Sequence, residues 1–195
     1  MRRPVGFALL FLGVLLLGYV GTTWASGALA RDRARAAWEA ERAQQTVESI
    51  HASFASLRRD EAPTVPGAPV ARLLIPSIGL DEIVVEGVGD AQLNAGPGHL
   101  PGSPLPGMAG NAIVSAHRDR HFRSLDELEV GDVIETETRQ QRVTWTVTEI
   151  RVLDAGAPAL FSAANPTLTL TTCWPVRFFG PAPDRLLITA EPTES

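Results

Sequence analysis

The single cysteine of the chain, Cys173, ends a run of alternating β-branched residues, TLTLTTC at 167–173. A cysteine nucleophile reacts as the thiolate, and a free thiol has a pKa of about 8.5, so a neighbouring imidazole and positive charge would favour its reaction. A lone cysteine can also be a small apolar residue that is simply buried. The residue by itself leaves both interpretations open.

Two residues elsewhere in the chain could complete a nucleophilic site. His117 ends an apolar run, NAIVSAH at 111–117, and Arg185 opens the last such run, twelve residues after Cys173. Two strand ends can lie side by side in a barrel, so a cysteine–histidine pair is geometrically reasonable. Arg185 stays charged at any working pH and could stabilise an oxyanion or hold a substrate carbonyl. It could equally be a solvated arginine at the start of a strand.

Residues next to these three are secondary candidates. Thr172 precedes the cysteine, and its backbone or hydroxyl could contact the substrate, unless it is a plain strand residue. Trp174 could cover the thiol or simply pack. Asp119 and His121 follow His117 and could orient its loop.

A segment rich in glycine and proline, GPGHLPGSPLPGMAG at 96–110, lies between two apolar runs. Nine of its fifteen residues are Gly or Pro, which predicts no regular structure. Its glycines match neither a dinucleotide-binding nor a P-loop fingerprint. The segment is either a surface connection or a wall of the site. In the second case His99 would line the cleft and bind substrate.

Composition excludes several kinds of chemistry. All 17 basic residues are arginine, so a Schiff-base or serine–lysine mechanism is impossible. The net charge is −5 and no basic block stands in the second half, which argues against nucleic-acid binding. His117 and His121 have the spacing of helical zinc ligands, but no glutamate lies between them and the flanking sequence indicates a strand entering a loop. We therefore expect no metal and no cofactor.

The elements that must position these residues are short strands. Runs rich in Val, Ile and Thr are separated by Gly/Pro turns, which is typical of an all-β sandwich or barrel. No regular repeat is visible, so a propeller or solenoid is not expected. The expected strands are 70–76, 80–87, 111–117, 131–138, 142–153, 167–173 and 185–191, with 131–138 and 142–153 forming a hairpin.

The first 69 residues differ in composition from this β-rich part. Arg2 and Arg3 precede an uncharged stretch from 4 to 30 that is long enough to cross a bilayer. Their charge predicts a cytoplasmic N-terminus, with the bulk of the chain outside. A cleaved signal peptide, processed near 28–30, is the alternative. Either interpretation exports the β-rich part.

The remaining boundaries follow from periodicity and from proline content. Apolar residues recur at steps of three and four within 31–61, which predicts a helical stalk, or alternatively a helix that binds a partner. Segment 62–69 is a linker with three prolines, and 70–195 is the catalytic domain.

Three separated motifs carry a resemblance to a known family. LLIPSIGLDEIVVEGVG, then LNAGPGHLPGSPLPGMAGNAIVSAHRDRHFRSLDELEVGD, then TLTLTTCWP with GPAPDRLLITA, occur in this order behind the uncharged stretch. Together they resemble the sortase family of cysteine transpeptidases, most closely class D sortases and their relatives in Gram-negative bacteria. Ser115 and Ala116 stand where relatives often have Ala–Gly, and Trp174 stands where Tyr is common. These departures bear on pocket shape and subclass.

The resemblance implies a closed β-barrel of about eight strands with short helices. It implies that Cys173 attacks the threonine carbonyl of an LPxTG-type sorting signal and forms a thioacyl-enzyme. It also implies that His117 is the general acid and base and that Arg185 steadies the oxyanion or the substrate backbone. The partners would be a protein bearing the sorting signal and an amine acceptor, from peptidoglycan precursor or protein. The enzyme would be a single-pass protein of the plasma (inner) membrane with an extracytoplasmic catalytic domain.

Two other functions use a similar chain. An exported L,D-transpeptidase acting on peptidoglycan also pairs Cys with His, but its usual Ser-His-Gly just before the cysteine is missing from LTTCWP. A non-catalytic β-barrel adaptor with a buried Cys173 would have a thiol that does not react in the folded protein.

Overall fold

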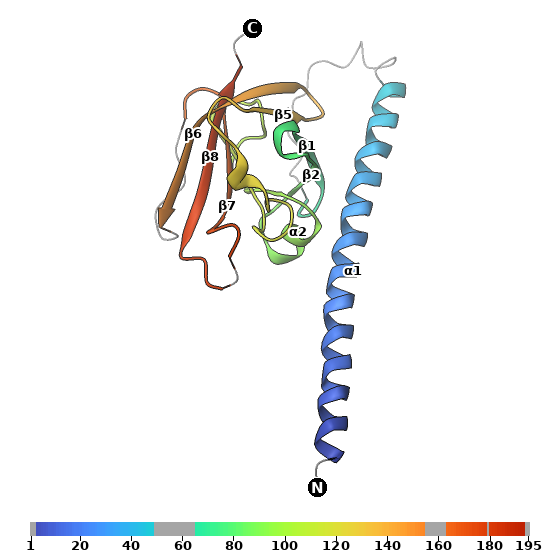
Figure 1. The fold of residues 1–195 in the computed structure, drawn as a ribbon. Coiled ribbons are helices and arrows are strands. Elements are labelled where there is room, and N and C mark those ends of the chain that lie inside the picture. The colour runs from blue at the N-terminus through green and yellow to red at the C-terminus, as the bar shows by residue number, and fades with distance from the viewer. Residues whose placement is uncertain (1–2, 49–64, 155–162, 179, 194–195) are drawn as a thin grey trace.

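The computed structural model describes residues 3–48, 65–154, 163–178 and 180–193. One long helix, α1 (Arg3–Glu48), runs alongside a β-barrel (Figure 1). The barrel strands are β1 (Pro69–Ile75), β2 (Leu80–Glu86), β3 (Gly98–His99), β4 (Asn111–Ser115), β5 (Val133–Glu137), β6 (Arg142–Asp154), β7 (Thr167–Trp174) and β8 (Asp184–Pro192). Short helices connect some of them: η2 (Pro76–Ile78), α2 (Asp90–Ala95) and η3 (Leu125–Glu127).

The barrel is closed, with strand order β1-β2-β3-β4-β7-β8-β6-β5 and β5 pairing back to β1. Inward-facing side chains alternate with outward-facing ones along each strand, so the closed sheet encloses a single apolar core. The largest fully buried side chains include Trp145, Phe122, Leu73, Ile134 and Leu168. The predicted all-β barrel of about eight strands with short helices is confirmed.

The β5–β6 hairpin forms as the sequence predicts, with Thr138 and Gln141 closing its turn. The prediction that 96–110 contains no regular structure is wrong at one point, because Gly98 and His99 form β3. This short strand pairs parallel with β2 and antiparallel with β4. A Cβ at Gly98 would lie 2.2 Å from the carbonyl oxygen of Gly87, so the glycine permits a close pairing that any side chain would block.

Helix α1 is continuous across the stretch where the sequence predicts first an anchor and then a stalk. Within the described residues, no helix combines the length and the apolar character needed to cross a membrane. The remainder of the predicted stalk, 49–61, and the first part of the linker, 62–64, lie outside the described residues. The proposed division of the chain into anchor, stalk, linker and catalytic domain stays a prediction.

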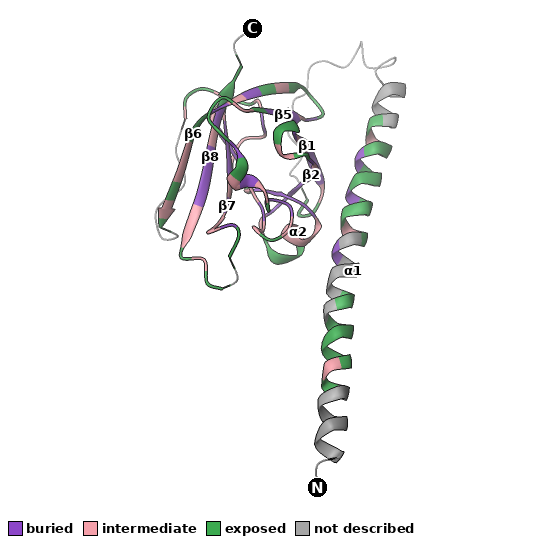
Figure 2. Ribbon diagram, in the orientation of Figure 1, coloured by how far each residue is buried: buried purple, intermediate pink, exposed green. Residues whose placement is uncertain are grey.

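The apolar contact between α1 and the barrel is small. Ala34 and Trp38 of α1 cluster with Ile83 and Val85 on the outer face of β2, and all four are buried. Figure 2 shows buried positions on the side of α1 that faces the barrel, with exposed residues around them. Among the described side chains, these four form the apolar cluster between α1 and β2, and the helix also lies against α2 and β1.

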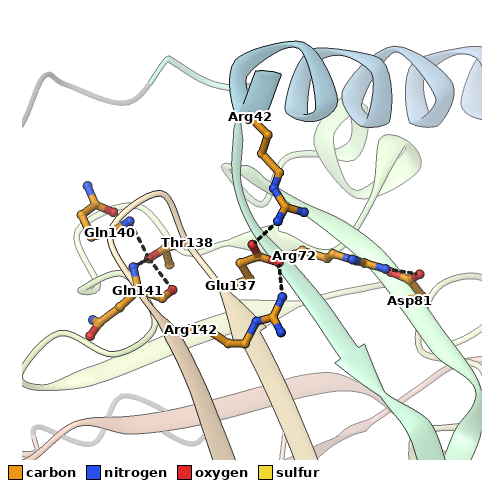
Figure 3. A network of polar contacts seen from close by, with 8 residues as sticks. All are labelled: Arg42, Arg72, Asp81, Glu137, Thr138, Gln140, Gln141 and Arg142. Carbon is orange, nitrogen blue, oxygen red and sulfur yellow. Dashed lines mark hydrogen bonds and ion pairs between the residues drawn. The ribbon is translucent and has the colours of Figure 1, made fainter. Parts of the chain in front are cut away.

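Ion pairs surround this contact (Figure 3). Glu137 of β5 lies 2.8 Å from Arg42 of α1 and 3.1 Å from Arg142 of β6. Arg72 donates two hydrogen bonds of 2.8 Å to the carboxylate of Asp81. These bonds are the main reason that the pKa of Asp81 is lowered and the pKa of Arg72 is raised.

Candidate active site

Cys173 lies near the end of β7 on the outer face of the barrel. Leu168 and Leu170 of the same strand belong to the core, and successive side chains of a strand point to opposite faces. Cys173 therefore faces outward with Thr169 and Thr171, and it is half-buried. The thiol is held on a regular strand next to solvent, not sealed in the core.

His117 reaches the same rim of the barrel from β4. Strands β4 and β7 are parallel, with Ser115 opposite Thr171, and the amide of Ala116 donates to the carbonyl of Thr171 beyond that pair. Two further residues along each chain lead to His117 and Cys173. Ala116 belongs to the core, so His117 faces outward as Cys173 does. The parallel register brings these two candidate side chains to neighbouring strand ends.

Arg185 stands on the other side of the cysteine. Strands β7 and β8 are antiparallel, and Cys173 and Arg185 are directly paired residues. Leu186 and Ile188 of β8 belong to the core, which leaves Arg185 on the outer face, half-buried. Its Nη1 donates to the carbonyl of Asp184 at 3.1 Å, which uses one of the five N–H donors of a guanidinium. The remaining donors can serve negative charge that develops beside Cys173.

Thr172 faces the other way. It is buried, and its Oγ1 donates a hydrogen bond of 2.7 Å to the carbonyl of Ala116. This bond joins the end of β7 to the end of β4, one residue before Cys173 and one before His117. The structure therefore gives the Thr172 hydroxyl a positioning role inside the barrel and does not bring it to the outer face with Cys173.

His99 is also separated from the cysteine. It is buried in β3 opposite Val114, on the inner side of the barrel wall. Its Nδ1 lies 2.7 Å from Oε2 of Glu86, and its Nε2 lies 2.9 Å from Oγ of Ser103 and 3.1 Å from the carbonyl of Pro104. The structure does not bring His99 together with Cys173.

Glu86, His99 and Ser103 are arranged in the order of a hydrolytic triad. The directions of their hydrogen bonds, however, are not those that such a triad needs. A carbonyl only accepts, so the contact with Pro104 requires a proton on Nε2 of His99. The Ser103 hydroxyl donates to the carbonyl of Leu100 at 2.8 Å, so its proton is not directed at the imidazole. The group fastens the Gly/Pro segment to the barrel instead.

Arg118 is a site residue that the sequence analysis missed. Its Nη1 donates to the carbonyl of Pro175 at 2.6 Å, and its Nη2 donates to the carbonyl of Gly180. Both acceptors belong to the loop between β7 and β8, which connects the strand that carries Cys173 to the strand that carries Arg185. Arg118 thus ties the loop that follows His117 to the loop that joins the other two candidates. An arginine directly after the histidine was visible in the sequence, but its acceptors were not.

The other secondary candidates hold the surroundings of the site. His121 is buried, and its Nδ1 lies 3.2 Å from Oε1 of Glu82, which attaches the loop after His117 to β2. Asp119 is exposed in the same loop. Trp174 packs against the barrel core, in line with the simpler of its two expected roles.

A hollow of about 410 Å³ opens along the outer face of β4. Asn111 and Ile113 of that strand line it together with residues 100–104 of the Gly/Pro segment and Ala163. Ile113 and His117 lie on the same face of the chain, four residues apart, which is about 13 Å at 3.3 Å per residue. The Gly/Pro segment therefore forms a wall next to the candidate site, one of the two roles that the sequence left open.

Residues 73–193, most of the barrel, match the family model described as the sortase domain. The chain belongs to the sortase family. It is 32% identical over 118 residues to Sortase D of Bacillus subtilis (strain 168), a match that covers 60% of each protein. The chain thus spans less than two thirds of that relative's length.

Solved sortase structures have the same fold. A Clostridium perfringens Sortase D5 transpeptidase superposes with a TM-score of 0.65 at 22% identity, covering 87% of this chain and 99% of that one. The catalytic domain of B. anthracis SrtD superposes with a TM-score of 0.57 at 30% identity, covering 71% of this chain and 97% of that one. Membership of the sortase family favours neither the L,D-transpeptidase alternative nor the adaptor alternative.

Proposed function

We propose that this sortase-family chain is a cysteine transpeptidase that anchors surface proteins. The observation that carries the proposal is the strand register around Cys173, which is paired with Arg185 and lies two residues beyond the Ser115–Thr171 pair that leads to His117. A nucleophile, a titratable acid–base group and a permanent cation thus share one face of three adjacent strands. Acyl transfer needs these three functions together.

In the first half-reaction, Cys173 transfers its thiol proton to His117, and the thiolate Sγ attacks the carbonyl carbon of the threonine in an LPxTG-type sorting signal. The oxyanion of the tetrahedral intermediate is stabilised by the guanidinium of Arg185. The peptide C–N bond then breaks, and His117 donates a proton to the departing amine. The product is a thioester between the threonine carbonyl and Cys173.

In the second half-reaction, the amine of the acceptor attacks the thioester carbonyl. His117, now neutral, takes the proton from this amine, and the C–S bond breaks to release Cys173 as the thiolate, which recovers the thiol when His117 returns the proton. A new amide joins the protein to the acceptor, which is a peptidoglycan precursor or another protein. No cofactor or metal takes part in either step.

The sorting signal would lie along the outer face of β4. The hollow at Asn111 and Ile113 would take the residues that precede the threonine. The span of about 13 Å between Ile113 and His117 is close to the length of four extended residues. A bulky apolar residue followed by proline would suit a hollow walled by Leu100, Pro101 and Pro104.

We further propose that the N-terminal part of α1 anchors the enzyme in the plasma (inner) membrane as a single span, with the catalytic domain extracytoplasmic. The support is in the sequence: an uncharged stretch from 4 to 30 behind Arg2 and Arg3. The absence of a second cysteine also suits an oxidising compartment, because a lone thiol has no partner within its own chain.

The test is mass spectrometry of the full chain in detergent, incubated with a library of LPxTG-type peptides and then with an amine. We expect a thioacyl adduct on Cys173 that transfers to the amine. Cys173→Ala should abolish the adduct, and His117→Ala and Arg185→Ala should reduce it strongly. Arg177→Ala is the control, because Arg177 is an exposed arginine of the β7–β8 loop that pairs with Asp126 and Glu127.

A thiol-reactive probe in the same experiment separates the alternatives. A folded chain whose Cys173 reacts neither with peptides nor with the probe would support the adaptor function and contradict the proposal. An adduct formed only with peptidoglycan stem peptides would support the L,D-transpeptidase alternative.

A further inference from the structure

A second hollow, of about 500 Å³, lies between α1 and the barrel. We call it the helix–barrel hollow. It is lined by α1 from Gly27 to Arg35, by the start of β2, and by the loop that follows His117. This hollow is separate from the one along β4, and the proposed transpeptidase reaction makes no use of it.

Both signs of charge line the helix–barrel hollow. Arg31 and Arg35 enter from α1, and Arg120 and Arg123 enter from the loop after His117. The carboxylates are those of Asp81, Glu82 and Asp119. Asp81 forms two hydrogen bonds with Arg72 from outside the hollow, and Oε1 of Glu82 lies 4.0 Å from Nη1 of Arg31. The four arginines and three carboxylates give the lining a formal charge of about plus one. Such a lining suits a ligand that carries a phosphate together with a cationic or hydrogen-bond-donating group.

Two buried polar atoms at this hollow have no partner. His121 and Glu82 contact each other through Nδ1 and Oε1, but Nε2 of His121 and Oε2 of Glu82 are buried without a hydrogen bond. The His121 residue is only 9% exposed. A buried carboxylate oxygen without a donor is energetically unfavourable, so a site of this kind favours a ligand that supplies one. An N–H donor would satisfy Glu82.

The hollow also lies at the end of the barrel that the N-terminal half of α1 passes. Figure 1 shows that half of the helix extending beyond the barrel on the side of α2 and the β7–β8 loop. Leu12, Leu17 and Tyr19 are exposed on it. Gly27 lines the hollow, close to the end of the uncharged stretch at residue 30. If this stretch spans the bilayer, as proposed above, the hollow meets the lipid headgroups.

We propose that the helix–barrel hollow binds the headgroup of a phospholipid of the phosphatidylethanolamine type. The phosphodiester contacts arginines from both α1 and the loop after His117, and the ammonium donates to Oε2 of Glu82. A choline headgroup has no N–H donor for Glu82, and a glycerol headgroup offers only neutral hydroxyl donors, which bind a carboxylate more weakly than an ammonium does. The bound lipid would hold the rim that carries His117 against the membrane surface. The inference rests on the membrane anchoring proposed above.

The experiment uses the full chain in nanodiscs that contain equal amounts of phosphatidylethanolamine and phosphatidylcholine. Native mass spectrometry then measures which lipid stays bound after release. We expect wild type to retain phosphatidylethanolamine over phosphatidylcholine by about tenfold, the value of one charge-assisted hydrogen bond of about 1.4 kcal/mol. Glu82→Gln should bring this ratio close to one. The double variant Arg120→Gln/Arg123→Gln should lower the retention of both lipids.

Controls separate the hollow from general surface charge and from misfolding. Glu135→Gln and Arg142→Gln change residues of β5 and β6 outside the helix–barrel hollow and should leave the lipid ratio as in wild type. Thermal unfolding of each variant, together with the thioacyl assay in detergent, identifies a variant that has simply lost its fold.

Four outcomes would overturn the inference. These are equal retention of the two lipids by wild type, the same preference in Glu82→Gln, stronger retention of phosphatidylglycerol in a parallel nanodisc, and full displacement of lipid by inorganic phosphate. A chain that does not enter nanodiscs at all would contradict the anchoring proposal as well. A chain that selects the lipid but forms no thioacyl adduct would contradict the transpeptidase proposal alone.

Discussion

The barrel is held differently on its two sides. At the ends of β4, β7 and β8, the strands are joined by paired backbone, by the buried Thr172 hydroxyl and by Arg118 bound to two carbonyls. Along α1, β1 and β5, exposed arginines and carboxylates pair across a small apolar contact around Trp38. The first side is held mainly by hydrogen bonds to backbone atoms, and the second mainly by ion pairs between side chains.

The two kinds of contact suit two different tasks: positioning the candidate site residues and docking α1 on the barrel. Acyl transfer requires reacting groups held to within a fraction of an ångström, which short bonds to the backbone can provide. Exposed ion pairs each contribute about 0–1 kcal/mol and are screened by salt. Each pair therefore adds little to the free energy that holds α1 against the barrel. We therefore expect substitutions on the first side to change chemistry and those on the second to change only docking or stability.

The largest expected effect is on Arg185. Arg185→Gln should slow thioacyl formation by about 10²–10³-fold, the usual cost of losing an oxyanion donor. The midpoint of thermal unfolding should change little, because Arg185 is half-buried on the outer face. Single-turnover kinetics with a cleaved peptide measures the rate. Arg177→Gln is the matched control, and a rate for Arg185→Gln within threefold of that control would contradict the assigned role.

Thr172→Val should lower the free energy of unfolding by about 1–3 kcal/mol, because the Ala116 carbonyl then loses its buried donor. Urea titration followed by circular dichroism measures this. Thr148→Val provides the comparison, since Thr148 also donates to a backbone carbonyl but is exposed. Equal losses in the two variants would show that burial of the Thr172 bond adds nothing.

Arg118→Gln should reduce kcat/KM by about tenfold, equivalent to about 1.4 kcal/mol, through loosening of the β7–β8 loop. A positioning role predicts that kcat falls more than peptide affinity, and that Arg118→Lys recovers part of the rate by keeping one donor. Arg123→Gln, five residues further along the same loop, should retain wild-type kinetics. If Arg118→Lys were no faster than Arg118→Gln, the positioning role of Arg118 would be contradicted.

On the other side of the barrel, Glu137→Gln removes the pairs to Arg42 and Arg142. The free energy of unfolding should fall by less than about 1 kcal/mol, and the difference from wild type should shrink in 0.5 M salt. Thioacyl formation should not change. If Glu137→Gln lost as much activity as Arg118→Gln, the expectation that only the first side affects chemistry would be contradicted.

The smallest expected effect is on the stability of the fold at low pH. Arg72 lowers the pKa of Asp81, so this carboxylate stabilises the fold above its unfolded pKa of about 3.9, and the contribution disappears as pH falls through the folded value. Wild type should therefore lose stability between about pH 5 and pH 2 slightly more steeply than Asp81→Asn does. Parallel slopes in urea titrations across that range would exclude the effect.

The sequence predicted the barrel well where strands are apolar and regular. It also marked Cys173, His117 and Arg185 as candidates, because each stands at the boundary of such a strand and has side-chain chemistry of its own. The structure adds that these strand ends are neighbours, and the roles of the three residues stay a prediction. It missed β3, since a glycine that permits close backbone approach looks the same as one that breaks a strand. Gly98 pairs with Val85 of β2 and Ser115 of β4, and the sequence around Gly98 does not show that these strands lie beside it.

The roles of Arg118, Thr172 and His99 depend on partners that no local pattern contains. Thr172 donates to a carbonyl 56 positions earlier in the chain, and any residue has that carbonyl. Arg118 likewise binds backbone oxygens of another loop. His99 was expected in a cleft because of its flexible neighbours, and its buried contact with Glu86 became visible only once β2 and β3 were paired.

The parallel pairing of β4 with β7 has a consequence for how activity arises during folding. Contacts between residues so far apart in sequence form late, because the entropy of closing the intervening chain must be offset first. The strands between them, β5 and β6, also belong to the closed barrel. In a chain that has not yet closed the barrel, Cys173 and His117 are therefore apart, and under the proposed mechanism the thiol gains its acid–base partner only when the barrel closes.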